Sequence, residues 1–192
     1  MAARDHARLA DSVFAAAAAL HERVRQNAGP TLVAAQALAD ALASGRKVLV
    51  FGNGGSAADA QHLSAELVGR FQKERPALAA MALTVDTSIL TSVANDYSYK
   101  QVFVRQIEAL GQPGDVAFGI STSGESPNVL LALQAARGRG MKTIALTGRD
   151  GGEVGRAAEI HVNVPSASTA RVQEVHRTLL HVMCELVEDA FV

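Results

Sequence analysis

Two segments of this chain place glycines and hydroxyl side chains directly after an apolar run. Residues 48–51 lead into Gly52-Asn53-Gly54-Gly55-Ser56, and residues 116–120 lead into Ser121-Thr122-Ser123-Gly124-Glu125-Ser126-Pro127. Glycines let backbone N–H groups turn toward a ligand, and a helix that starts in such a loop adds unpaired donors and the positive end of its dipole. We therefore expect a phosphate held from two sides. The surrounding hydroxyls favour a phosphosugar as the ligand.

A purely structural use of these hydroxyls accounts for only some of them. Ser56 is expected to cap a helix, with Asp59 at the third helical position as its capping partner. Ser126 precedes Pro127, which is typical of a helix start. Capping leaves Ser121, Thr122 and Ser123 unexplained, and these remain candidates for ligand binding.

The segment 52–57 also matches a permissive G-x-G-x-x-A dinucleotide fingerprint, with Asp86 as the acid that would bind the ribose. Asp86 lies about 30 residues downstream, whereas the fingerprint places this acid about 20 residues on. The spacing therefore argues against a nucleotide.

Four further side chains could hold a metal ion or move protons. His62 and Glu66 are four residues apart and share one helix face. Gln173 and His181 are eight residues apart on a long C-terminal helix, about 80° apart around its axis, so both can face one cleft. Two imidazoles, a carboxylate and an amide oxygen suit zinc. Spacing alone leaves open a solvated His/Glu pair and a core histidine at 181, while His176 is expected to be structural.

The elements that position these residues alternate between strands and helices after Gly45. This alternation predicts a parallel sheet with helices on both faces, and ligands of such sheets bind at the carboxyl ends of the strands. Two helices, 9–24 and 31–43, precede the first strand as an expected hairpin that packs on the sheet or on another subunit. The expected strands are 47–51, 79–84, 115–120, 142–147 and 159–164, and the expected helices are 56–71, 87–94, 99–110, 127–139, 151–157 and 169–190.

The composition narrows the class of protein. With 192 residues, 48% hydrophobic content and a formal charge of −1, the chain can bury one good core and lacks the cation excess of a nucleic-acid-binding protein. Cys184 is the single cysteine, so no internal disulfide forms, as is typical of a reducing cytoplasm. The longest apolar run, residues 13–20, is shorter than the roughly 20 residues that span a bilayer, and nothing near Met1 resembles a signal peptide. We expect a soluble cytoplasmic protein without a nucleic-acid or membrane partner.

Several separate motifs, in order along nearly the whole chain, carry a family resemblance. The chain resembles sugar isomerase (SIS) domain proteins and, among them, the bacterial phosphoheptose isomerases. The motifs are GNGGSAADAQH at 52–62, RP at 75–76, ANDY at 94–97, GDV at 114–116, ISTSGES at 120–126, LTGRDGG at 146–152 and RVQEVH at 171–176.

The resemblance implies one SIS domain over residues 1–192, with a helical hairpin at 1–45 and an α/β sandwich with a five-stranded, flavodoxin-like parallel sheet at 46–192. It implies a homotetramer that converts sedoheptulose 7-phosphate to D-glycero-D-manno-heptose 7-phosphate, the first step toward the ADP-heptose of lipopolysaccharide. The implied catalytic groups are Glu66 and His181, and one zinc per subunit would be held by His62, Glu66, Gln173 and His181. The implied substrate-binding residues are Asn53, Gly54, Gly55, Ser56, Glu66, Asn95, Asp96, Ser121, Thr122, Ser123, Ser126 and Gln173.

Two alternatives follow from the same resemblance. A related non-catalytic branch binds the replication initiator DnaA, but it lacks the Glu and the late His that this chain carries as Glu66 and His181. An isomerase of another phosphosugar is the second alternative, because phosphate binding does not select chain length. One departure concerns residues 165–171, which contain no carboxylate where isomerases often carry one.

Overall fold

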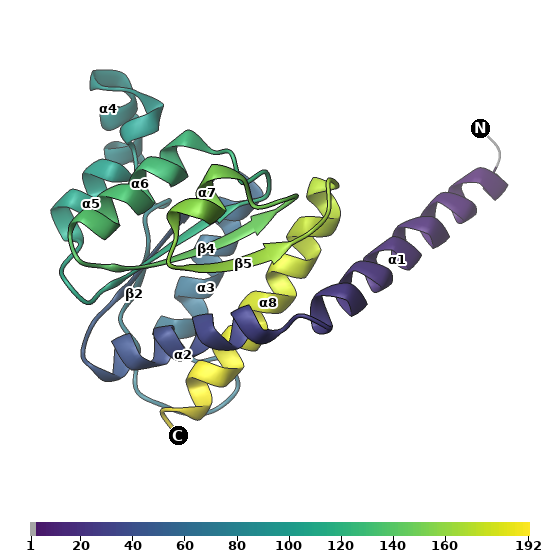
Figure 1. The fold of residues 1–192 in the computed structure, drawn as a ribbon, viewed down its shortest axis with the longest axis horizontal. Helices are drawn as coiled ribbons and strands as arrows, with labels where there is room; N and C mark the ends of the chain where they lie inside the picture. The colour runs from purple at the N-terminus through teal and green to yellow at the C-terminus, as the bar shows by residue number, and fades with distance from the viewer. Residues whose placement is uncertain (1–2) are drawn as a thin grey trace.

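Five parallel strands form one sheet at the centre of the molecule (Figure 1). The structure is a computed structural model that describes residues 3–192, with side chains from residue 5 onward. The strands lie in the order β2-β1-β3-β4-β5, which confirms the flavodoxin-like sheet expected from the sequence. Their bounds are Val48–Gly52 (β1), Ala80–Ala82 (β2), Val116–Ser121 (β3), Lys142–Gly148 (β4) and Ile160–Val164 (β5).

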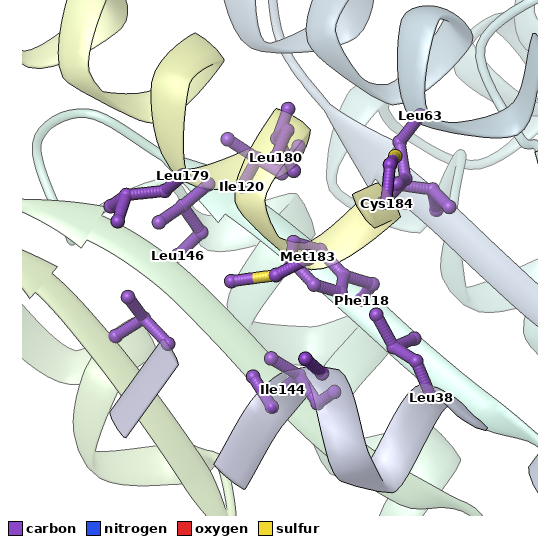
Figure 2. Close-up of a cluster of buried hydrophobic side chains, with 14 of the residues drawn as sticks. Leu38, Leu63, Phe118, Ile120, Ile144, Leu146, Leu179, Leu180, Met183 and Cys184 are labelled. Carbon is purple, nitrogen blue, oxygen red and sulfur yellow. The ribbon is translucent and has the colours of Figure 1, made fainter. Parts of the chain in front are cut away.

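Helices cover both faces of the sheet. Successive strand residues point to opposite faces, so Val48 and Val50 of β1 join one buried cluster while Leu49 and Phe51 join the other. Figure 2 shows the first cluster, in which Met183 of α8 lies close to Phe118 of β3. The first cluster includes α2 (Gly29–Ala43), α3 (Gly55–Val68) and α8 (Thr169–Asp189), and the second includes α5 (Val104–Leu110), α6 (Pro127–Gly138) and α7 (Gly152–Ala157).

The two leading helices are both present, and they differ in how they pack. α1 (Ala3–Arg25) buries Leu20 and Val24 near its C-terminal end, whereas Leu9 and Phe14 are exposed. In Figure 1, α1 projects away from the sheet, while α2 lies against it. Within residues 3–192 no helix has the length and apolar content needed to cross a membrane.

Several expected elements have different bounds in the structure, beginning with the first helix, which was expected at 9–24 and spans Ala3–Arg25. The helix expected at 56–71 begins at Gly55 and ends at Val68, because Gly69 caps it and the chain then turns back. The helix expected at 99–110 is divided into η1 (Tyr99–Gln101) and α5, with Phe103 at the break packed on Phe51 at 5.4 Å between ring centroids. The edge strand β2 is shorter than expected, and α4 (Thr87–Asp96) follows it without a buried residue.

Candidate active site at the carboxyl ends of the strands

The two glycine-containing loops lie beside each other. β1 and β3 are hydrogen-bonded neighbours with Gly52 opposite Ile120, so the loops that follow them leave the sheet at the same edge. The Asn53 and Asn128 side chains bond reciprocally at 2.9 and 2.8 Å, and the Tyr99 hydroxyl donates to Asn53 Oδ1 at 3.1 Å. These contacts tie the first loop to the start of α6.

The start of α3 differs from the capping expected for Ser56. Gly54 occupies the N-cap position with a φ of 55°, a conformation that favours glycine, and the helix therefore begins at Gly55. Ser56 is the second helical residue, is buried, and makes no capping bond. Asp59 pairs with Arg177 of α8 at 2.7 Å. The predicted capping pair of Ser56 and Asp59 is therefore wrong.

The second loop turns its hydroxyls toward one another. Ser121 Oγ lies 2.9 Å from Ser126 Oγ and 3.4 Å from Ser123 Oγ, and it accepts the Gly124 N–H at 3.2 Å. Ser126 does occupy the N-cap of α6, but its side chain makes no capping bond. Thr122 is part-buried in the same turn. The loop thus presents a cluster of hydroxyls that can exchange their mutual bonds for bonds to an anion.

The titratable cluster joins α3 to α8. His62 Nε2 lies 2.7 Å from His181 Nε2 and 3.4 Å from Glu66 Oε1. One ligand atom from each of the three side chains lies within 4.8 Å of the others. The His62 and Glu66 side chains are 26% and 23% exposed, so a substrate can reach them. Phe71 packs on His181 at 5.5 Å between ring centroids.

The charge state of His62 suits metal binding. Burial lowers its pKa below the usual value, and the nearby Arg177 guanidinium lowers it further, while Glu66 acts in the opposite direction. A neutral imidazole is therefore favoured at neutral pH, and only a neutral ring offers a lone pair to a metal.

The three donors are of a type that binds zinc, and one of their separations matches the geometry of a zinc site. Bonds of about 2.0–2.1 Å at tetrahedral angles separate ligand atoms by about 3.3–3.4 Å. The separation of His62 Nε2 from Glu66 Oε1 matches this value. The two imidazole nitrogens are closer than this, so their mutual hydrogen bond must open for both to bind one ion.

Gln173 lies against Gly55, since a Cβ atom at Gly55 would overlap the Gln173 amide. Gly55 is seven residues before His62 on α3, and Gln173 is eight before His181 on α8, so the contact of His62 with His181 lies about two turns further along both helices. Two turns are about 11 Å of helix, so the structure does not bring Gln173 beside the other three residues predicted to bind the metal. A cavity of about 560 Å³ opens here, lined by Gly55, Asp59, Gln173, Arg177 and His21 among others. Its volume lies within the range of small-molecule sites.

Asn95 and Asp96 end α4, are exposed, and bond to each other at 2.9 Å. Among the described residues neither hydrogen-bonds to the two loops, so their role in substrate binding stays a prediction. Asp86 caps α4 by accepting the Ile89 N–H at 2.9 Å, which gives it a structural task in place of ribose binding.

Four residues at the site were not predicted from the sequence: Tyr99, Asn128, Phe71 and Arg177. Asn128 had a local signal, because it follows the Ser-Pro start of a helix at the mouth of the serine loop. Phe71 follows Glu66 by five residues and Arg177 precedes His181 by four, but their contacts with His181 and Asp59 depend on how α3 and α8 pack. Tyr99 reaches Asn53 from 46 positions away in the chain. The loop before α8 contains no carboxylate, and its residue Ser168 forms the N-cap of α8.

Comparisons with known proteins identify the family and the fold of this chain. A family profile described as "SIS domain" matches residues 13–148. A phosphoheptose isomerase of Geobacter sulfurreducens is 57% identical over 164 residues, covering 85% of this chain and 87% of that protein. A phosphoheptose isomerase of Aquifex aeolicus is 60% identical over 152 residues, covering 79% of this chain and 80% of that protein. The solved structure of the phosphoheptose isomerase from Neisseria gonorrhoeae is 44% identical with a TM-score of 0.89, covering 96% of this chain and 98% of that one.

Proposed function

We propose a mechanism for this chain from the premise that it belongs to the SIS domain family and, within that family, to the phosphoheptose isomerases. It is an isomerase of a phosphorylated heptose. Its reaction converts sedoheptulose 7-phosphate to D-glycero-D-manno-heptose 7-phosphate, on the route to the ADP-heptose of lipopolysaccharide. The observation that carries the mechanism is the convergence of His62, Glu66 and His181 where α3, the helix that begins in the first loop, packs on α8.

The substrate phosphate binds the loops. Ser56 and the backbone N–H groups after Gly54 meet it from α3, and Ser121, Ser123 and Ser126 meet it from the second loop, with Thr122 beside them. The hydroxyls now bond only to one another and to the loop backbone, so an anion gives them a better acceptor. The Asn53 side chain holds the loops together through Asn128 and Tyr99.

Proton transfer belongs to Glu66 and His181. Glu66 removes a proton from C1 of the ketose while His181 donates a proton to the C2 carbonyl oxygen, which gives an enediol. Glu66 then returns its proton to C2, and the C1 hydroxyl proton passes back to His181, which gives the aldose. Gln173, Asn95 and Asp96 are the proposed partners of the sugar hydroxyls.

The same cluster is the proposed zinc site, with one ion per subunit held by His62, Glu66 and His181. The assignment of Gln173 as a fourth ligand stays a prediction from the family resemblance, because Gln173 lies about two helical turns from His181 on α8. When bound, zinc supplies a Lewis acid that polarises the sugar carbonyl. The chemical type of the three donors and the 3.4 Å separation of His62 Nε2 from Glu66 Oε1 support the proposal. Glu66 has two carboxylate oxygens, so one can serve as ligand while the other accepts the proton.

We also propose a single domain over residues 1–192, assembled as a cytoplasmic homotetramer. An apolar cavity of about 530 Å³ between α1, α2 and α8, with Val24, Leu32 and Leu179 among its lining residues, supports burial of this face by another subunit. A lone, buried Cys184 is typical of a reducing compartment.

The direct test is incubation of purified protein with sedoheptulose 7-phosphate and detection of the heptose phosphate by NMR. Parallel incubations with other ketose phosphates test the chain-length preference. Absence of product in all of them, with and without added zinc, would contradict the proposed reaction.

A further inference from the structure

A carboxylate near the C-terminal end of α8, Glu188, lies near the catalytic cluster without taking part in the proposed chemistry. Glu188 follows His181 by seven residues, two helical turns, so both side chains lie on nearly the same face of α8. The Glu188 side chain is only 2% exposed. A charge buried to this degree requires specific partners.

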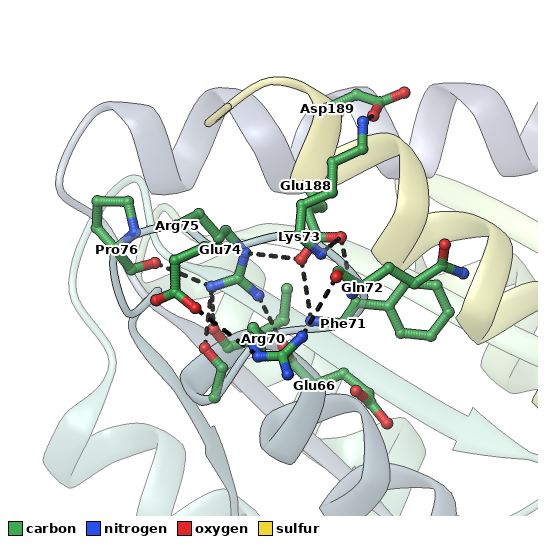
Figure 3. A network of polar contacts seen from close by, with 12 residues as sticks. Glu66, Arg70, Phe71, Gln72, Lys73, Glu74, Arg75, Pro76, Glu188 and Asp189 are labelled. Carbon is green, nitrogen blue, oxygen red and sulfur yellow. Dashed lines mark hydrogen bonds and ion pairs between the residues drawn. The ribbon is translucent and has the colours of Figure 1, made fainter.

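Glu188 binds the loop that follows α3, as Figure 3 shows. Its Oε1 accepts the Phe71 N–H at 3.0 Å, and its Oε2 accepts the Gln72 and Lys73 N–H groups at 2.8 Å each. The first of these residues carries the ring that packs on His181. The carboxylate therefore fixes one wall of the titratable cluster.

Arg75 connects Glu188 to the end of α3. Its Nε lies 3.5 Å from Glu188 Oε1, and its side chain is 1% exposed. Its terminal nitrogens donate to the carbonyl oxygens of Glu66 at 2.7 Å and Leu67 at 2.9 Å. These carbonyls belong to the last turn of α3, where they have no partner within the helix. Arg75 thus holds the backbone of Glu66 itself.

Burial opposes ionisation of Glu188, yet the N–H groups of Gln72, Lys73 and Phe71 and the Arg75 guanidinium outweigh it and hold the pKa below its usual value. The carboxylate is therefore charged at neutral pH, and the pair links α8 to α3 as an ionic contact.

We propose that Arg75 and Glu188 are positioning residues that set the separation of Glu66 on α3 from His181 on α8. The inference rests on the proposed function of that cluster. The two helices each carry part of the catalytic and metal-binding set, and this pair joins them at the end nearest Glu66. Its loss therefore changes the alignment of Glu66 and His181, while the phosphate loops at the other end of α3 keep their contacts.

The test compares Glu188→Gln with a matched control, Asp115→Asn. Asp115 is also a carboxylate that is 2% exposed, accepts two backbone N–H groups and pairs with a cation, Lys47, but it lies at the amino end of the sheet. Three quantities are measured for each variant. Zinc affinity is measured by calorimetry on metal-free protein, and kcat and KM are measured with sedoheptulose 7-phosphate as substrate. The free energy of unfolding is measured in urea. Arg75→Lys is a second variant that keeps the charge but cannot span the carbonyls of α3.

We expect Glu188→Gln and Arg75→Lys to weaken zinc binding by about tenfold or more, the usual effect of losing a residue that orients metal ligands. We expect kcat of these two variants to fall by a similar factor while KM stays within twofold of wild type. Asp115→Asn should lose stability but keep its zinc affinity and its kcat. Folded variants within twofold of wild type in both zinc affinity and kcat overturn the proposal, as do equal losses in Asp115→Asn. If the wild-type protein binds zinc but does not isomerise the substrate, the proposed function is overturned. The zinc affinities of the variants then decide whether Arg75 and Glu188 position the cluster. A wild type that does neither overturns both.

Discussion

The Nε2 atoms of His62 and His181 lie 2.7 Å apart, so one ring donates a hydrogen bond to the other. Two Nε2–H groups at this distance would place their hydrogens against each other, so the two rings together carry one proton at these atoms. In the ring that donates this hydrogen bond, the proton occupies the Nε2 lone pair that a metal would need. Metal binding therefore requires the proton to move to Nδ1 or to leave the ring.

Zinc binding is the first consequence to test. We expect about one zinc per chain in protein purified without chelator, measured by elemental analysis. His62→Ala should reduce this stoichiometry strongly, because it removes one of the three clustered donors. His6→Ala is the control, since His6 is an exposed imidazole on α1. Equal zinc content in wild type and His62→Ala would show that the metal binds elsewhere.

Glu66→Gln isolates the proton transfer. The amide keeps the size of the side chain but cannot act as a base, so kcat should fall by about a hundredfold or more while KM stays within about threefold. His181→Gln should behave in the same way. Glu108→Gln, on the exposed face of α5, is the control and should turn over like wild type. The catalytic assignment fails if Glu66→Gln retains wild-type kcat at matched zinc content.

The serine loop should determine phosphate affinity. Replacing both Ser121 and Ser123 by alanine removes two hydroxyl donors, each worth about 1.5–3 kcal/mol toward a charged acceptor. We expect KM for the sugar phosphate to rise by about tenfold or more, and the inhibition constant of inorganic phosphate to rise in parallel. Ser12→Ala on α1 is the control. An unchanged inhibition constant for phosphate in the double variant would remove the loop from the binding site.

Much of the fold was predictable because its signals are local. The apolar runs at β1, β3 and β4 are bounded by glycines, and their side chains serve two cores in alternation. The end of α3 had a local signal in Gly69, which caps the helix. The path of the chain after Gly69 had none, because residues 71–73 are held by Glu188, more than a hundred positions later.

In the candidate site, too, the local features were predictable and the contacts between distant elements were not. His62 and Glu66 share a helix face by spacing alone, and the two loops share an edge because parallel strands end together. The 2.7 Å contact of His62 with His181 depends on how α3 packs against α8, and no local pattern encodes it. Ser56 was misassigned as a cap because the positive φ of Gly54 starts the helix one residue earlier.

His176 is a different kind of histidine, and its burial makes stability depend on pH. It is fully buried, and its Nε2–H donates to the Thr147 carbonyl oxygen at 2.9 Å. Its Nδ1 has no partner among the described residues. Burial lowers the pKa of His176 to about 4, against a weaker raising effect of the bond to Thr147. The ring is therefore neutral in the folded protein at physiological pH.

The sign of the pH effect follows from the two pKa values. In the unfolded chain His176 titrates near pH 6.5, so between about pH 6.5 and 4 the unfolded state binds the proton and the folded state does not. The free energy of unfolding should therefore fall as the pH drops through this window, by about 3 kcal/mol from this residue. His176→Gln keeps a donor for Thr147 but cannot titrate, so its unfolding free energy, measured in urea from pH 7 to 4.5, should fall less steeply than that of wild type. Other carboxylates and histidines contribute equally to both proteins, so the difference between the two slopes isolates His176. Parallel slopes would show that the imidazole is hydrated or paired in the folded state and that its burial does not oppose protonation.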